Sequence, residues 1–196
     1  VLTGLPATGE IRLVIARDSL RQFRMAYGPD RKRLKSVLQW GKVVWSNLDS
    51  AFAGCSNMDI TTGATIPVLY QVQSMASMFD GCEALTGDTL MGLWRTERVR
   101  DMARLFKGAV NFNRDISAWK TDSVEDMGEM FSGAKLFDKD IGNWNTGKVK
   151  FMGKMFFDCQ SFSHSIGNWN VSQVVNMNRM LNGASAYNKP LSNWVF

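Results

Sequence analysis

Residues 123–144, SVEDMGEMFSGAKLFDKDIGNW, form a segment that the chain repeats at a fixed interval. Phe131 in this segment has an equally spaced counterpart on each side, at Phe106 and at Phe156. The same 25-residue step recurs in three columns of apolar residues, namely Phe106, Phe131, Phe156 and Leu181; Trp119, Trp144, Trp169 and Trp194; and Val99, Val124, Val149 and Val174. A fixed period between about 20 and 50 residues is typical of a repeat array, in which each unit packs on its neighbours.

Each repeat unit changes character halfway along its length. Apolar residues in the first half follow the spacing of one helix face, at Val124, Met127, Met130, Phe131 and Ala134. This spacing predicts a short helix around Met127–Phe131, with Ser123 as its N-cap and Gly133 at its end. The second half, residues 138–142, predicts a short strand with Ile141 buried.

The repeats therefore predict an α/β solenoid of short strands and short helices. Strands centred near Ile116, Ile141 and Ile166 should form a parallel ladder, and helices such as Met152–Phe156 should lie on the opposite side. The array is expected to occupy residues 46–196 with about six units and no cap at its C-terminal end.

Residues 1–45 have no counterpart at this step and are predicted to be a β-rich cap over the first unit. Segments 11–16, 20–27 and 34–45 are interpreted as strands, with a turn at residues 28–30. The net charge of +5 comes from this segment, because residues 1–45 hold nine Lys and Arg against three Asp and Glu, whereas the rest of the chain holds fourteen against fifteen.

The basic residues of this cap are interpreted as an exposed hairpin tip, and they are Arg21, Arg24, Arg31, Lys32, Arg33 and Lys35. Nucleic-acid binding would favour such a patch with interleaved aromatics, but the run RKRLK directly follows a turn. We therefore expect no nucleic-acid partner. An anionic surface or a polysaccharide is the alternative ligand of the cap.

Three cysteines occupy one repeat position, at Cys55, Cys82 and Cys159, and alanine fills it at Ala109, Ala134 and Ala184. The position is predicted to need a small buried residue, and free cysteine behaves as a small hydrophobe. A bridge between Cys55 and Cys82 in adjacent units is the alternative. The tryptophan column and a methionine column are likewise predicted to be core packing. The methionine column consists of Met75, Met102, Met127, Met152 and Met177, with Met78, Met130, Met155 and Met180 three residues further on.

The sequence contains no catalytic motif and no metal-ligand spacing, and it has a single histidine. An enzyme with catalytic residues, a metal or another cofactor is therefore not expected. No apolar run approaches the ~20 residues that span a bilayer, so membrane insertion of this segment is not expected either.

One column of cationic or titratable residues repeats at the 25-residue step, and it consists of Arg114, Lys139, His164 and Lys189. If the column faces solvent, its charges should add across units and attract an anionic ligand. Asp115 and Asp140 run beside it, so a solvated and partly neutralised stripe is the alternative interpretation.

The pattern VxxMxxMFxGA, followed by FNRDISAWKTDSV, resembles the surface-protein repeat of BspA-like leucine-rich repeat bacterial proteins. The resemblance covers roughly residues 46–196, and the lead-in QWGKVVWSNLDSAFAGCSNM looks similar as well. Leu181, Ser165 and Pro190 depart from the usual residues at their positions. The resemblance implies a leucine-rich-repeat-like solenoid at the cell surface or secreted, with no catalytic residues.

The expected function is that of a non-enzymatic repeat module in a bacterial cell-surface protein. Its partner would be a macromolecule, either a protein of a host or neighbouring cell or an acidic glycan, and its role would be adhesion. A structural spacer or stalk segment of a larger surface or fibre protein is the alternative. The sequence does not specify the oligomeric state.

Overall fold

A computed structural model describes residues 21–26, 28, 30–61 and 63–195 of the chain. Regular secondary structure among them is limited to four short elements: η1 (Arg31–Arg33), β1 (Ser36–Val37), β2 (Asp59–Ile60) and η2 (Thr89–Leu93). The two η elements are 3-10 helices, and β1 pairs in parallel with β2. Turns and isolated bridges make up the rest of the described chain.

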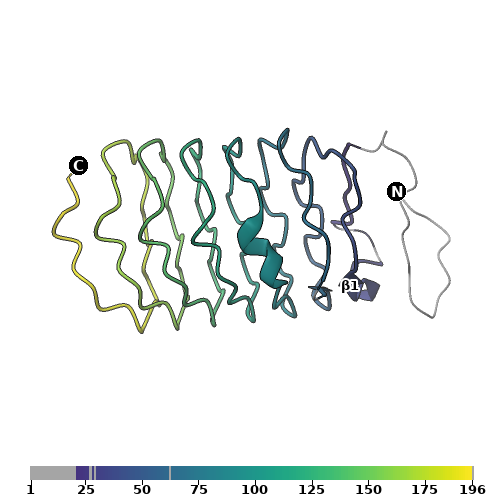
Figure 1. Cartoon of the computed structure of the whole chain (residues 1–196). Helices are drawn as coiled ribbons and strands as arrows, with labels where there is room; N and C mark the ends of the chain where they lie inside the picture. The colour runs from purple at the N-terminus through teal and green to yellow at the C-terminus, as the bar shows by residue number, and fades with distance from the viewer. Residues whose placement is uncertain (1–20, 27, 29, 62, 196) are drawn as a thin grey trace.

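The chain winds into a stack of coils that lie side by side along one axis (Figure 1). Isolated parallel bridges join each coil to the next, in the pairs Ser74–Asp101, Asp101–Asp126, Asp126–Phe151 and Phe151–Asn176. From Asp101 onward, each bridge joins residues one 25-residue step apart, so the period predicted from the sequence is confirmed.

The predicted α/β leucine-rich-repeat-like solenoid of strand and helix units is wrong. No α-helix occurs among the described residues, and the segments Met127–Phe131 and Met152–Phe156 are runs of turns. The strands expected near Ile116, Ile141 and Ile166 are absent as well, because these buried residues lie in irregular or turn segments. The parallel contacts occur instead where helices were predicted.

The hydrogen bonds of residues 127–134 explain why no helix forms. Three amides close overlapping turns by donating three residues back, in the pairs Met130–Met127, Ser132–Glu129 and Ala134–Phe131. The intervening amides donate to the next coil over 2.7–2.9 Å, in the pairs Met127–Phe151, Glu129–Gly153, Phe131–Met155 and Gly133–Phe157. A helix needs every amide for bonds four residues back within one segment. Half of the amides of residues 127–134 donate to the next coil instead, so a helix cannot form.

Residues with a left-handed backbone conformation make this run of turns possible. Glu129 has a φ of 57° and Gly133 a φ of 74°, and each is the third residue of a hydrogen-bonded turn, as in type II turns. The Gly133 position recurs through the stack with positive φ, at Gly54, Gly81, Gly108, Asp158 and Gly183. Adjacent coils also approach closely here, since a Cβ on Gly133 would lie 3.6 Å from the Gly108 Cα.

The core of the stack is a set of ladders, one side chain per coil. Phe131 stacks on Phe106 and Phe156 with ring centroids 5.7 Å apart, within the range of favourable aromatic pairs. Each residue of the tryptophan column donates its indole N–H to a backbone carbonyl oxygen of the preceding coil, as Trp144 does to Ile116 over 3.3 Å. The prediction that the methionine and tryptophan columns are core is confirmed, although Met177 and Trp194 in the last coil are only partly buried.

The cysteine prediction is confirmed in the same way. Cys55, Cys82 and Cys159 are fully buried and free, so the Cys55–Cys82 bridge is absent. The Cys159 thiol donates to the Ala134 carbonyl oxygen over 3.2 Å. Burial raises the pKa of Cys55 to about 11 and that of Cys159 to about 12, so both stay protonated at neutral pH.

The N-terminal cap is described only in part. The strand predicted for residues 11–16 lies outside the described residues. Gln22 forms a parallel bridge with Asn47, and the 34–45 segment contributes β1 and a bridge from Val44 to Val68. The first described coil is thus joined to the array by the same kind of parallel contact as the later coils.

Candidate binding surface

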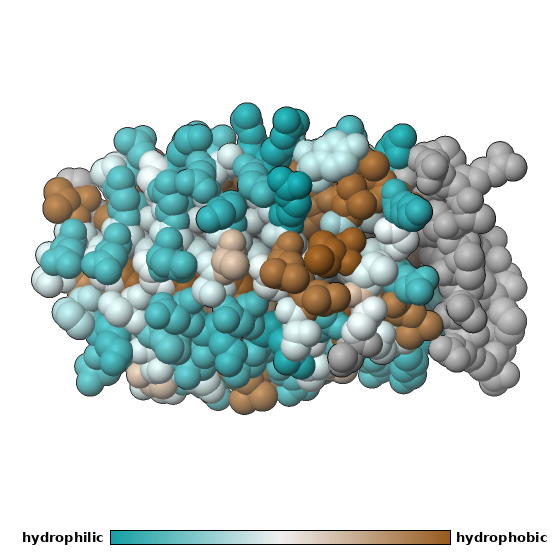
Figure 2. Space-filling view, viewed as in Figure 1, coloured by the Kyte–Doolittle hydropathy of each residue, from teal (hydrophilic) through white to brown (hydrophobic). Residues whose placement is uncertain are grey.

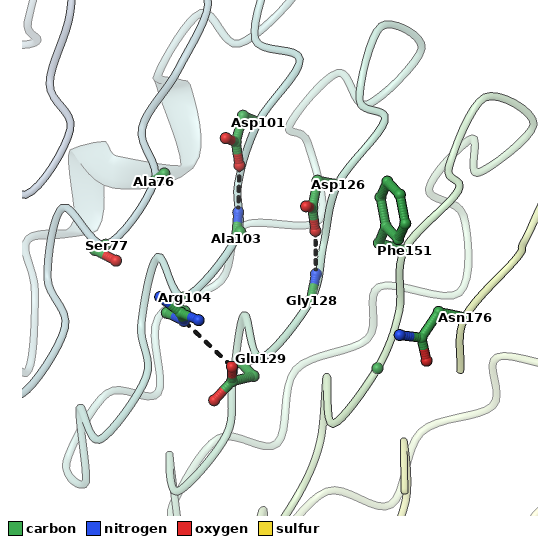
Figure 3. Close-up of a pocket in the computed structure, with 11 residues that line it drawn as sticks. Ala76, Ser77, Asp101, Ala103, Arg104, Asp126, Gly128, Glu129, Phe151 and Asn176 are labelled. Atoms are coloured by element: carbon green, nitrogen blue, oxygen red, sulfur yellow. Dashed lines mark hydrogen bonds and ion pairs between the residues drawn. The ribbon is translucent and has the colours of Figure 1, made fainter. Parts of the chain in front are cut away.

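A shallow trough of about 430 Å³ crosses five successive coils on the side of the bridge ladder (Figure 3). It is open to solvent along its length. Its lining residues are Ala76, Ser77, Asp101, Ala103, Arg104, Asp126, Gly128, Glu129, Phe151, Gly153 and Asn176. Because equivalent positions line it in each coil, the trough follows the axis of the stack.

The floor of the trough consists of small residues, such as Ala103, Gly128 and Gly153. Most coils enter the floor through a turn capped by the polar side chain two residues earlier, but Phe151 offers no such cap to Gly153. Asp126 Oδ1 accepts from the Gly128 amide over 2.7 Å, and Asp101 Oδ1 accepts from the Ala103 amide over 2.9 Å. These caps fix the start of the turn in their coils.

One rim of the trough is formed by Asp101, Asp126, Phe151 and Asn176, which occupy the same position in successive coils and lie in a row (Figure 3). Burial raises the pKa of Asp101, and the nearby carboxylates of Asp126 and Asp49 raise it further against the lowering effect of the Ala103 amide. Phe151, which is 42% exposed, interrupts the acidic row. This rim therefore offers carboxylates beside an aromatic face.

The opposite rim carries an ion-pair cluster around Glu129. Arg104 Nε lies 3.2 Å from one carboxylate oxygen of Glu129, and Lys107 Nζ lies 2.5 Å from the other (Figure 3 draws the Arg104 pair). Partial burial disfavours the Glu129 carboxylate, but the hydrogen bonds from Lys107 and Arg104 outweigh burial and lower its pKa. The cluster ties adjacent coils together and leaves a mixed-charge edge.

A second ion-pair ladder runs along the outside of the stack. The Glu125 carboxylate lies 2.7 Å from Lys150 Nζ and 3.8 Å from Arg100 Nη1, and each partner belongs to a neighbouring coil. Lys150 is the main cause of the lowered pKa of Glu125. Exposed pairs of this kind contribute little stability each, so the ladder mainly sets the charge pattern of the surface.

The predicted cationic column is not part of the trough, since Arg114, Lys139, His164 and Lys189 do not line it. Hydrogen bonds at the 25-residue step between Asn113 and Asp138 and between Asp138 and Ser163 place the column in adjacent coils. Arg114 is partly buried over Gly87, and its Nε donates to the Thr86 and Gly87 carbonyls over 3.0 and 2.7 Å.

The other members of the column differ in their surroundings. His164 Nε2 lies 3.5 Å from Asp138 Oδ1, and its side chain is 38% exposed. Lys139 is partly buried and contributes to the lowered pKa of Asp115, which comes mainly from the hydrogen bonds of Ser117. Lys189 is exposed. The column is thus a row of unequal groups, and only part of its positive charge faces solvent freely.

The sequence reasoning missed the trough, although a signal for it was visible. A capping residue, a methionine and a small or polar residue recur at the 25-residue step, as in Asp101-Met102-Ala103 and Asp126-Met127-Gly128. An Asp or Asn followed two residues later by Ala or Gly is typical of a turn and argues against a helix interior. Interpreting the methionines as one helix face hid this signal.

A separate apolar patch lies towards the N-terminal half. Figure 2 shows hydrophobic side chains gathered over η2 and towards β1, whereas the face over the C-terminal coils is mostly hydrophilic. Leu38, Ile66 and Leu93 are exposed large apolar residues in this half of the chain. Trp40 lies between the coils here, because its amide donates to Thr65 Oγ1 and its ring lies 5.4 Å from that of Trp94.

Two further observations concern the described part of the chain. No cluster of three or more His, Cys, Asp or Glu residues could hold a metal ion there. No helix in it is long and apolar enough to cross a bilayer. In the basic cap, Arg33 pairs with Asp30 over 2.6 Å, and the Arg31 side chain packs over Gly54.

Comparison with known proteins corrects the resemblance to BspA-like leucine-rich repeat proteins. No curated protein and no solved structure matches the chain. One family model matches it twice, over residues 46–157 and 73–194, and that family is not a BspA-like leucine-rich repeat family. The two matches together span the whole regular stack. The chain therefore belongs to the family described as Mycoplasma protein of unknown function, DUF285.

Proposed function

We propose that the chain is a non-enzymatic binding module of a bacterial cell-surface protein, and that it holds an extended protein or glycan ligand along the trough. The observation that carries the proposal is the continuity of the trough across five coils, with a floor of small residues between two polar rims. A ligand that lies along the stack axis would contact equivalent groups in each coil.

The chemistry of the rims supports an extended polar ligand. Carboxylates such as Asp101 and Asp126 can accept hydrogen bonds from sugar hydroxyls or from lysine and arginine side chains. Phe151 offers an apolar face beside them. The same carboxylates repel acidic ligands, so an acidic glycan would have to bind elsewhere, with the column of Arg114 and Lys139 as its place.

The alternative function is a spacer that holds another part of a longer protein at a distance. The stacked phenylalanines and the hydrogen bonds between successive coils favour this function, because they make the stack stiff without need of a ligand. The two functions make different predictions for trough variants, since a spacer tolerates any change there that leaves stability intact.

The test screens the purified chain against a glycan array and a peptide array, and then measures the best ligand with the variant Asp101→Asn/Asp126→Asn. We expect binding to weaken at least about tenfold, because two charge-assisted hydrogen bonds are lost. Asparagine should keep the turns, since Asn176 already caps the equivalent turn by accepting from the Asn178 amide over 3.0 Å.

The matched control is Asp115→Asn/Asp140→Asn. These carboxylates cap turns through the amides of Ser117 and Gly142 but lie outside the trough, so the control removes the same charge elsewhere. Equal binding by the two double variants would contradict the trough as the site. A loss of binding confined to Arg114→Gln/Lys139→Gln would move the site to the cationic column.

A further inference from the structure

One coil breaks the series of caps along the trough. In four coils a polar side chain accepts from the amide two residues later over 2.7–3.3 Å, and these side chains are Ser74, Asp101, Asp126 and Asn176. Phe151 stands at the same position and has no acceptor to offer. Of the eleven residues that line the trough, Gly153 alone has a backbone amide with no acceptor among the described residues. The floor therefore offers one free hydrogen-bond donor, in the coil of Phe151.

This donor lies among groups of different chemistry. Phe151 is 42% exposed and stands between Asp126 and Asn176 in the rim (Figure 3). Asp126 uses Oδ1 for the Gly128 amide, and its Oδ2 has no partner in the described part of the chain. The Asn176 side chain lies over Gly153, since a Cβ there would come within 3.1 Å of Asn176 Oδ1. An aromatic face, a carboxylate oxygen and a free donor thus meet in neighbouring coils.

The trough also carries negative charge that its own cations do not balance. Arg104 and Lys107 are both paired with Glu129, whereas neither Asp101 nor Asp126 belongs to an ion pair of the described residues. Burial raises the pKa of Asp101, and neighbouring carboxylates raise it further. A positive group beside the two carboxylates would offset their repulsion and would form charge-assisted hydrogen bonds with them. A neutral sugar offers no such gain, so the charges favour a cationic ligand.

The single free amide also limits how a polypeptide could bind here. Strand addition uses main-chain hydrogen bonds along an open edge, and the other amides that line the trough already donate within the stack. Recognition must therefore depend mainly on side chains. A lysine or arginine side chain suits the Phe151 coil, because its aliphatic stem can pack on a ring while its charged head reaches a carboxylate.

We propose that the coil of Phe151 is a subsite for a lysine or arginine residue of an extended basic polypeptide that lies in the trough. The aliphatic stem packs on Phe151, the charged head pairs with Asp126, and a neighbouring peptide carbonyl oxygen accepts from the Gly153 amide. Alternate side chains of an extended chain lie on one face, so a second cationic residue reaches Asp101. The subsite rests on the proposed function and names the class of its ligand.

The experiment titrates the whole chain calorimetrically with a synthetic peptide in which arginine alternates with serine. Two further probes are the peptide with glutamate in place of arginine and a neutral oligomer of N-acetylglucosamine. We expect only the arginine peptide to bind, and we expect its affinity to fall as salt is added. In NMR spectra of the complex, the Gly153 amide proton should move to lower field because it gains an acceptor.

Phe151→Asn tests the subsite without a change of charge. It removes the ring and supplies the missing cap, as Asn176 does for the Asn178 amide. Peptide binding should weaken at least about tenfold, because a packing surface and a free donor are lost together. Phe151→Ala leaves the amide free and should weaken binding less, about threefold. The matched control is Leu136→Asn, at a leucine that is exposed but does not line the trough, and it should bind as wild type does.

The outcomes separate the subsite from the proposed function. The subsite is overturned if the arginine peptide does not bind, or if it binds Phe151→Asn as tightly as wild type. Should Asp101→Asn/Asp126→Asn alone lose binding, the trough remains the site and only the role of Phe151 fails. Binding of the neutral oligomer that depends on Phe151, without binding of the peptide, would make the ligand a glycan. Binding that neither variant changes would contradict the trough itself.

Discussion

Gly142 illustrates how tightly neighbouring coils constrain single residues. A Cβ at this position would overlap the backbone carbonyl oxygen of Ser165 in the next coil. Gly147, five residues later, has only the tips of Asn145 and Asn170 near its would-be Cβ, at 3.3 and 3.6 Å. Backbone atoms held by the stack cannot move away, whereas side-chain tips can.

We therefore predict that Gly142→Ala lowers the free energy of unfolding by about 1–3 kcal/mol, as overpacking does elsewhere. Gly147→Ala should change it by less than about 0.5 kcal/mol. Urea denaturation of both variants measures the difference. Equal effects of the two substitutions would show that the coils are less tightly packed than the structure indicates.

Two carboxylates that line the trough should affect stability with opposite signs. The raised pKa of Asp101 means that its ionised form destabilises the fold above the usual Asp value of 3.8. The lowered pKa of Glu129 means that its ionised form stabilises the fold above the usual Glu value of 4.5, and that this stabilisation is lost as pH falls through the lowered pKa.

Asp101→Asn should thus raise stability at pH 7, and Glu129→Gln should lower it by about 0.5–1 kcal/mol after solvent screening. Both differences should shrink towards zero at a pH below the lowered pKa of Glu129, where wild type and variants carry the same charge at these positions. Denaturation at pH 7 and in acid checks the signs. Effects of the same sign at pH 7 would contradict the assigned environments.

At the scale of the element, the structural unit of this fold is a set of equivalent side chains that stack on one another from coil to coil. Phe131 contacts Phe106, Phe156 and Phe137, with ring centroids 5.7, 5.7 and 4.0 Å apart. Its ring therefore belongs to three coils at once. The run of turns around it has no helical or strand stability of its own, and it depends on these contacts.

Phe131→Ala should lower the free energy of unfolding by about 3–5 kcal/mol, as for other fully buried phenylalanines. Hydrogen exchange should accelerate in the coils on both sides, because each loses a stacking partner. Phe151→Ala, in which the ring is 42% exposed, is the control and should cost less than about 1 kcal/mol. A loss of protection limited to residues 126–137 would contradict the shared ladder.

At the scale of the whole molecule, the uniform 25-residue step makes the middle coils interchangeable. Asp101, Asp126 and Phe151 bridge to one another in the same way, so removing residues 126–150 brings equivalent donors and acceptors into contact. We predict that this deletion yields a shorter folded stack with a smaller denaturant m-value, because less surface is buried.

Deletion of residues 126–138 is the matched test. It removes about half of one coil and puts buried positions such as Ile141 opposite exposed ones, so the variant should not fold cooperatively. Far-UV circular dichroism and urea denaturation distinguish the two deletions. A half-coil deletion that folds as well as the full one would show that the register between coils is weakly specified.

The sequence by itself determined the period of the array, its buried columns and the position of its glycines. These features could be predicted because a side chain that recurs once in every repeat must meet its own copy in a stack, whatever the backbone does between copies. Met127, Phe131, Cys159 and Trp144 are buried as predicted for this reason.

Only the tertiary structure decided the backbone conformation and the place of the trough. The spacing of Met127, Met130, Phe131 and Ala134 fits a helix, but a run of overlapping turns buries the same residues. The choice between them depends on whether the amides of Met127 and Glu129 find acceptors within their own segment or in the next coil. Those acceptors, the carbonyls of Phe151 and Gly153, belong to the following repeat, and only the stacked chain brings them within 2.9 Å.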